Sequence, residues 1–155
     1  MRKQLFLLFM VTSLTANFVY TQETHRLSLG VGIEGNLNSR QGMALGKNFS
    51  LDYGINRFLS AGMKAGFSKD FNRILIWEPD AFIRWYFKDF SSFLLFVQAD
   101  LGASIILTDA RVYPVMLGGI SGGIRFPLDK WYVEPYIRSG YPFILGAGMS
   151  AGYRF

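Results

Sequence analysis

The sequence predicts an all-β fold: an eight-stranded antiparallel up-and-down transmembrane β-barrel with a polar, Gly-rich interior. Apolar and polar residues alternate with period two in segments of about ten residues, which is the periodicity of β-strands. The chain is 50% hydrophobic with 17 glycines. After the N-terminal segment, however, no stretch approaches the roughly 18 uninterrupted apolar residues of a membrane-spanning helix. Charges of both signs occupy the polar positions of the segments, and the apolar positions carry almost none.

Residues 1–21 form a separate unit, which we interpret as a secretory signal peptide that is cleaved before Gln22. Arg2 and Lys3 precede the short apolar run LFLLFMV, and a more polar stretch follows. The apolar run is too short for a helix to cross about 30 Å of hydrocarbon. Residues 22–155 then form the transmembrane β-barrel as one domain. The alternative is an uncleaved N-terminal anchor, since the segment lacks a clear small-residue cleavage motif.

The first and last predicted strands show the alternation best. In the first, Leu and other aliphatic residues at positions 27, 29, 31 and 33 oppose Ser28, Gly30, Gly32 and Glu34. In the last, residues 145–155, Leu, Ala, Met and aromatic residues alternate with Gly, Ser and Arg. Between them the same pattern predicts six strands, at residues 49–55, 58–67, 74–87, 92–105, 115–126 and 131–139.

The connections alternate in length along the chain. Residues 56–57, 88–91 and 127–130 are predicted to be tight turns of polar or Pro/Asp type. Residues 37–47, 68–73 and 106–114 are predicted to be longer loops, and residues 140–142 a brief connection. Short turns at one end and longer loops at the other describe an up-and-down meander. Pro79 and Pro135 each remove a ladder donor, which predicts a bulge or local irregularity at both.

The face that carries the charges is predicted to point into the barrel. If the apolar face pointed inward, a ring of eight strands could not hold so many Phe and Trp side chains. Pointing outward, it forms an apolar band that lipid solvates. The predicted interior charges, which we interpret as a network of paired ions, are Glu34, Asp52, Lys64, Glu78, Asp80, Arg84, Asp100, Arg125, Glu134, Arg138 and Arg154. The alternative is a water-soluble, lipocalin-like barrel with the faces reversed.

Outward aromatic residues lie towards the predicted strand ends, where membrane barrels place their interfacial girdles. The predicted girdle residues are Trp77, Trp85, Phe87, Phe126 and Trp131. Phe143 is expected to face outward as well, near the ends that carry the longer loops. Hydrocarbon offers no partner to backbone groups, so the first strand must pair with the last.

An N-terminal signal, eight amphipathic strands and the C-terminal pair Tyr153 and Phe155 resemble the small outer-membrane β-barrels of the OmpA/OmpX/OmpW-like class. The resemblance covers nearly all of residues 22–155. It implies that Tyr153 and Phe155 form a C-terminal assembly signal read by the barrel-assembly machinery, with periplasmic chaperones acting during biogenesis. Ser150 and Gly148 depart from the residues usual at their positions in that signal. The implied location is the bacterial outer membrane.

Composition excludes several kinds of chemistry. Without Cys there is no thiolate metal site and no Cys nucleophile, and the single His25 gives no basis for a His-based triad. Glu78 and Asp80 share a face and could act as acid and base, but with Arg84 nearby a salt-bridge cluster is the preferred interpretation. We therefore expect no enzyme activity, no catalytic residue, no cofactor and no metal. The formal charge of +5 is scattered, so no nucleic-acid partner is expected.

Two functions follow from this pattern. The first is a monomeric integral outer-membrane protein with a structural or surface-interaction role, its partner being outer-membrane lipid and its lumen largely filled by the ion-pair network. The alternative is a narrow, porin-like outer-membrane channel for small solutes, apolar ones included. Nearly equal numbers of interior acids and bases favour the first, and the many small interior glycines favour the second.

Overall fold

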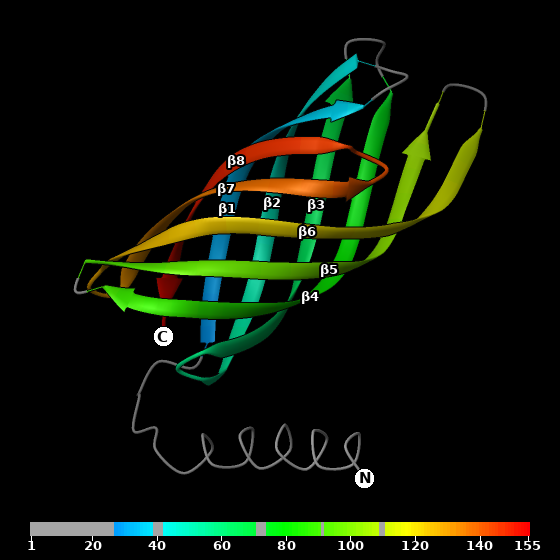
Figure 1. The fold of residues 1–155 in the computed structure, drawn as a ribbon. Helices are drawn as coiled ribbons and strands as arrows, with labels where there is room; N and C mark the ends of the chain where they lie inside the picture. Colours follow the sequence, from blue (N-terminus) through cyan, green and yellow to red (C-terminus); the bar gives the residue numbers. More distant parts are fainter. Residues whose placement is uncertain (1–26, 39–41, 71–73, 91, 109–110) are drawn as a thin grey trace, which may run out of the picture.

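The computed structural model describes residues 27–38, 42–70, 74–90, 92–108 and 111–155, and these form a closed antiparallel β-barrel (Figure 1). Each strand pairs with its neighbours in chain order, and β1 pairs with β8 to close the barrel. The strands are β1 Leu27–Asn38, β2 Gly42–Asn56, β3 Leu59–Asp70, β4 Leu75–Phe90, β5 Phe93–Leu107, β6 Val112–Leu128, β7 Trp131–Tyr141 and β8 Leu145–Arg154. The predicted fold class is confirmed. The predicted signal peptide and His25 lie outside the described residues.

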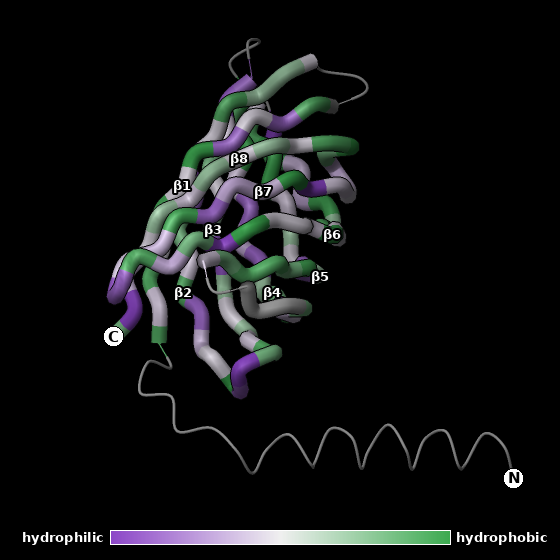
Figure 2. The backbone as a smooth tube through the Cα atoms, turned by 60° about the vertical axis from the view of Figure 1, so that its left-hand side comes forward, coloured by the Kyte–Doolittle hydropathy of each residue, from purple (hydrophilic) through white to green (hydrophobic). Residues whose placement is uncertain are grey.

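Hydrophobic and hydrophilic residues alternate along the strands (Figure 2). Burial follows the same period: in β4, Phe82 is 3% exposed while its neighbour Ile83 is 59% exposed. Large apolar side chains project from the outer wall on every strand, and polar and charged side chains fill the inside. The wall therefore has the reverse polarity of a water-soluble barrel.

Two predicted loops are largely strand. β1 continues to Asn38 and β2 begins at Gly42, so that Asn38 lies opposite Gly42 across a connection of residues 39–41. Gly42 has a φ of 85°, a conformation that favours glycine. The alternation does continue through the predicted loop 37–47, but its inward positions hold Ala and Gly, which hide the pattern. The predicted loop 106–114 shrinks in the same way, since β5 reaches Leu107 and β6 begins at Val112.

The two strand prolines bring the local irregularity that was expected, but no bulge: residues 78 and 79 have no partner in the β4–β5 ladder, and residues 134 and 135 have none in the β6–β7 ladder. Next to Pro79, Trp77 pairs with Ile105 and Asp80 pairs with Gly102, so the register is the same on both sides. The register is likewise constant across Pro135. A proline removes one ladder hydrogen bond there without inserting a residue. The register shifts lie nearer the strand ends, between residues 54 and 56 and between residues 86 and 88.

Phe143 corrects another expectation, because it faces into the barrel rather than outward. It is 2% exposed and packs with Ala44 and Ile76, with Ile74 and Ile106 alongside. Strand parity does not extend to Phe143, which lies in the connection between β7 and β8. We call this apolar group the mouth cluster. It fills the interior at the end of the barrel where the chain passes from β1 to β2 and from β3 to β4.

Candidate functional site

The charged interior is the candidate site, because it gathers buried ionisable side chains from seven of the eight strands. Period-two geometry directs every second residue of a strand inward. Ten of the eleven predicted network residues have side chains no more than 9% exposed, and all ten form ion pairs. They fall into three groups, described in turn below.

The first group, which we call the Glu134 cluster, joins Glu134 and Asp52 to Arg84 and Arg125. Glu134 Oε1 accepts hydrogen bonds from Arg84 Nη1, at 2.9 Å, and from Arg125 Nε. Asp52 Oδ2 lies 3.2 Å from Arg125 Nη2 and 3.7 Å from Arg84 Nη1. Two cations thus face two carboxylates, so the cluster is neutral when all four groups are ionised.

Aromatic rings enclose both arginines of the Glu134 cluster. The Arg84 guanidinium lies 4.4 Å from the ring centre of Phe96, and that of Arg125 lies 4.1 Å from the ring centre of Tyr132. Tyr86, which packs edge-on against Phe96, lies 5.2 Å from the Arg125 guanidinium. A cation over a ring face gains more when water is excluded. The rings and ion pairs together fill this level of the lumen.

The second group, which we call the Arg138 cluster, centres on one guanidinium between two carboxylates. Arg138 Nη1 donates to Glu34 Oε1 at 3.0 Å and to Glu78 Oε2 at 3.2 Å. Glu34 also accepts a 2.9 Å hydrogen bond from the Tyr136 hydroxyl and a 2.8 Å hydrogen bond from Asn36 Nδ2. Hydrogen bonds to charged groups are stronger than neutral ones, so Glu34 is held firmly in place.

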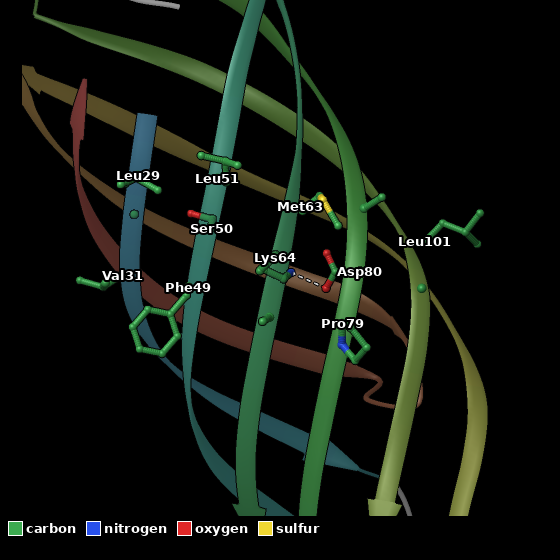
Figure 3. Close-up of a pocket in the computed structure, with 14 residues that line it drawn as sticks. Leu29, Val31, Phe49, Ser50, Leu51, Met63, Lys64, Pro79, Asp80 and Leu101 are labelled. Carbon is green, nitrogen blue, oxygen red and sulfur yellow. Dashed lines mark ion pairs between the residues drawn. The ribbon is translucent and has the colours of Figure 1, made fainter. Parts of the chain in front are cut away.

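The third group, which we call the Lys64 cluster, contains one cation and two carboxylates. Lys64 Nζ lies 3.5 Å from Asp80 Oδ2 and 3.3 Å from Asp100 Oδ1, and Figure 3 shows the pair with Asp80 between β3 and β4. Gln98 connects this cluster to the first, because it donates to Asp100 at 2.6 Å and accepts from Arg84 Nε at 2.8 Å.

The three clusters together hold six carboxylates and four cations, so the network carries a formal charge of −2 when fully ionised. Four buried carboxylate oxygens accept no hydrogen bond from the described residues: Asp52 Oδ1, Glu78 Oε1 and both oxygens of Asp80. Buried polar atoms of this kind call for a partner such as water. A cavity of about 20 Å³ beside Lys64 and Arg84 has room for about one water molecule.

Arg154 is the predicted network residue that the structure places elsewhere. It lies at the end of β8, and its Nη2 donates to the backbone carbonyl of Asp129 in the β6–β7 turn. Its position in the alternation predicts an inward side chain. Because Arg154 lies close to the rim, its long side chain reaches the turn instead of the lumen. Asn36, Asn48 and Ser121 join the network although they were not predicted to, since Asn36 and Asn48 donate to Glu34 and Ser121 donates to Asp100. All three point inward by parity, so the period itself was the signal that could have found them.

The predicted girdle residues all lie on the outer wall, with exposed fractions from 38% for Trp77 to 59% for Trp131. Several stack with aromatic neighbours: Trp77 lies on Phe67 with ring centres 6.2 Å apart, and Trp131 packs edge-on against Tyr153 at 5.0 Å. Tyr153 in turn packs edge-on against Phe155. Trp85 stacks on Phe87, and Phe126 packs against Phe93.

Solved structures with a similar fold include bacterial outer-membrane proteins and a designed transmembrane barrel. Neisserial surface protein A matches with a TM-score of 0.64 and 10% identity over 83% of this chain and 96% of that one. The N-terminal β-barrel domain of Pseudomonas aeruginosa OprF matches with a TM-score of 0.61 and 13% identity, over 85% of this chain and all of that one. A de novo designed transmembrane β-barrel matches with a TM-score of 0.60 and 12% identity, over 88% of this chain and all of the design.

The fold is that of the small eight-stranded outer-membrane β-barrels. The resemblance seen in the sequence is confirmed at this level. No protein family and no curated protein sequence matches the chain. Within the described residues, no helix has the length and apolar character needed to cross a membrane, and no group of three or more His, Asp or Glu side chains is arranged to hold a metal ion.

Proposed function

We propose that the protein is an integral outer-membrane β-barrel with a structural or surface-interaction role and a lumen that does not conduct. The observation that carries this proposal is the pairing of an apolar outer wall with an interior filled by buried ion pairs. Met116 and Ile120 on the wall are 70% and 63% exposed, whereas Glu78 and Glu134 inside are 0% and 2% exposed. Lipid is the solvent that suits such a wall.

Blockage at three levels supports a closed lumen. At one level the Glu134 cluster and its aromatic rings fill the lumen, and the Arg138 and Lys64 clusters occupy the levels above it. The mouth cluster adds an apolar layer beyond the Arg138 cluster, with the ring centre of Phe143 5.8 Å from the Arg138 guanidinium. An ion that entered would have to break buried pairs, and each broken pair leaves an unpaired charge. With the lumen filled, the wall and the loops are the surfaces left for interaction.

Biogenesis is part of the same proposal. Residues 1–21 would direct export and be removed. The barrel-assembly machinery, helped by periplasmic chaperones, would recognise Tyr153 near the end of β8 and Phe155 just after it. Phe155 is 55% exposed on the outer wall, where another protein can reach it. The proposed barrel is a monomer without enzyme activity.

Planar-bilayer recording tests the closed lumen. The purified, folded protein is expected to give a silent bilayer, and Arg138→Ala combined with Phe143→Ala should stay silent too, because the Glu134 and Lys64 clusters still fill their levels. Adding Lys64→Ala and Arg84→Ala, which removes a cation from each of these clusters, is expected to give ion-conducting openings. Ile137→Ala, a wall substitution at a residue that is 62% exposed, serves as the matched control and should stay silent. Insertion is checked in each case by the heat-dependent mobility of the folded barrel on gels. Steady openings of the unaltered protein would overturn the closed lumen and favour the channel alternative.

A further inference from the structure

Two lysines interrupt the apolar outer wall. Among the outward-facing strand residues whose side chains the structure describes, Lys47 on β2 and Lys69 on β3 are the only charged ones. Both are exposed, and neither forms an ion pair with a described residue. A Lys on a lipid-facing position is unfavourable unless it lies near the membrane surface. Two of them on adjacent strands therefore call for an explanation.

The strand register places the two lysines next to each other. Lys47 lies opposite Phe67, and Leu45 lies opposite Lys69, so the lysines are diagonal neighbours across the β2–β3 ladder. Diagonal partners are about 7–8 Å apart, close enough for one anion to contact both ammonium groups. Lys69 is one residue from the end of β3. The stacked pair Phe67 and Trp77 lies beside them, as aromatic residues do at a membrane interface.

An apolar groove includes the two lysines in its lining. It has a volume of about 750 Å³ and runs over the outer wall of β8, β1, β2 and β3 to the edge of β4. Ile33, Leu45, Phe67 and Met149 line it with apolar side chains. The small outward-facing residues Gly35 and Ala147 leave the wall low between them. The groove thus combines two cations, on β2 and β3, with an extended apolar surface.

We propose that this groove binds a membrane lipid with a phosphate-bearing anionic headgroup. The phosphate lies between Lys47 and Lys69 and relieves the repulsion between them, and an acyl chain lies along Ile33, Leu45 and Met149. The inference rests on the proposed function, because only a membrane-inserted barrel presents this wall to lipid. Apolar lining favours a lipid over a free phosphate ion, which would use the cations and leave the groove in contact with hydrocarbon.

A second groove on the same wall shows what the lysines add. The groove of about 630 Å³ drawn in Figure 3 is lined by apolar residues that include Leu51, Met63 and Leu101. Its one lysine, Lys64, has its ammonium group paired with Asp80 and Asp100 inside the barrel. That groove can take an acyl chain but has no free cation to select a headgroup, so we assign the headgroup preference to the groove at Lys47 and Lys69 alone.

Quenching of Trp77 fluorescence by brominated lipid tests the proposal. The full chain, with Trp85→Phe and Trp131→Phe to leave Trp77 as its only tryptophan, is folded into phosphatidylcholine vesicles that contain a minor fraction of brominated phosphatidylglycerol or brominated phosphatidylcholine. Brominated phosphatidylglycerol is expected to quench Trp77 more strongly. Its relative affinity should fall about five-fold for each lysine removed by Lys47→Gln and Lys69→Gln, the effect of one cation near an anionic surface.

The controls distinguish binding at this groove from a general attraction of the positively charged protein to anionic lipid. Lys130→Gln removes an equal charge from an exposed turn at the other end of the barrel and should leave the preference unchanged. Excess inorganic phosphate should not displace the lipid. Each of three results would overturn the lipid site. They are equal quenching by both brominated lipids, a fall in relative affinity for Lys130→Gln as large as for the other two lysines, and full displacement of the lipid by inorganic phosphate. Absence of quenching by either lipid, with no heat-dependent gel shift, would overturn the membrane barrel itself and this inference with it.

Discussion

Substituting Glu134→Gln tests the energetic role of the buried ion pairs most directly. Glu134 is 2% exposed, and its Oε1 accepts hydrogen bonds from both Arg84 and Arg125. Gln keeps the shape and removes the charge, so that Asp52, at 3.7 Å and 3.2 Å from the two guanidinium groups, becomes the sole carboxylate facing two buried cations. Removing one partner of a buried pair costs about 3–5 kcal/mol. We expect the free energy of unfolding to fall by that amount.

Urea unfolding of the protein in lipid vesicles, followed by tryptophan fluorescence and by gel mobility, measures this change. Ser150→Ala is the matched control, because Ser150 Oγ lies 3.4 Å from Glu134 Oε2 and its removal leaves every charge in place. It should cost about 1 kcal/mol. Glu134→Gln combined with Arg84→Gln rebalances the cluster and should recover part of the loss. If Glu134→Gln costs no more than Ser150→Ala, water screens the interior and the reasoning is wrong.

Two further predictions concern the packing of the lumen and the polarity of the wall. Gly148→Ala should lower the free energy of unfolding by about 1–3 kcal/mol, because its Cβ would lie 2.6 Å from the hydroxyl of Tyr136, whereas Gly118→Ala, with no atom within 4 Å, should not destabilise. Equal urea midpoints for the two variants would contradict this account. Ile137→Lys, in the middle of β7, should cost about 2–4 kcal/mol in the same assay, and Leu128→Lys at the end of β6 at most about 1 kcal/mol. A reversed order would mean that the barrel does not present this wall to hydrocarbon as described.

Much of the fold could be predicted from the sequence because one environment acts on every strand. Lipid outside and a narrow lumen inside give each residue of a strand one of two surroundings, so period two is nearly unbroken in β4 and β8. The alternation is hidden where the inward residues are too small to show a pattern, and for that reason a loop was predicted at residues 37–47 where the chain forms strand. The prediction was also wrong at Phe143, because parity says nothing about a residue in a turn.

The sequence predicted which residues belong to the candidate site, but not which of them form ion pairs with each other. Parity shows that Glu34 and Arg138 both face inward, yet they are 104 residues apart in the sequence and meet only through the stagger of strands around the barrel. That stagger depends on the register of each pair of strands, and the alternation of inward and outward residues does not determine the register. Arg154 shows a further limit, since a long side chain near a rim can reach a turn.

Closure of the sheet and neutralisation of the lumen are coupled events. Glu34 on β1 meets Arg138 on β7, and Asp52 on β2 meets Arg125 on β6, so the pairs join the first strands of the chain to the last. A half-formed sheet would hold these charges without partners and an open edge without hydrogen bonds, both unfavourable in hydrocarbon. Intermediates with a few inserted strands are therefore disfavoured, because the β1–β8 pairing that removes the open edge also brings these charges together.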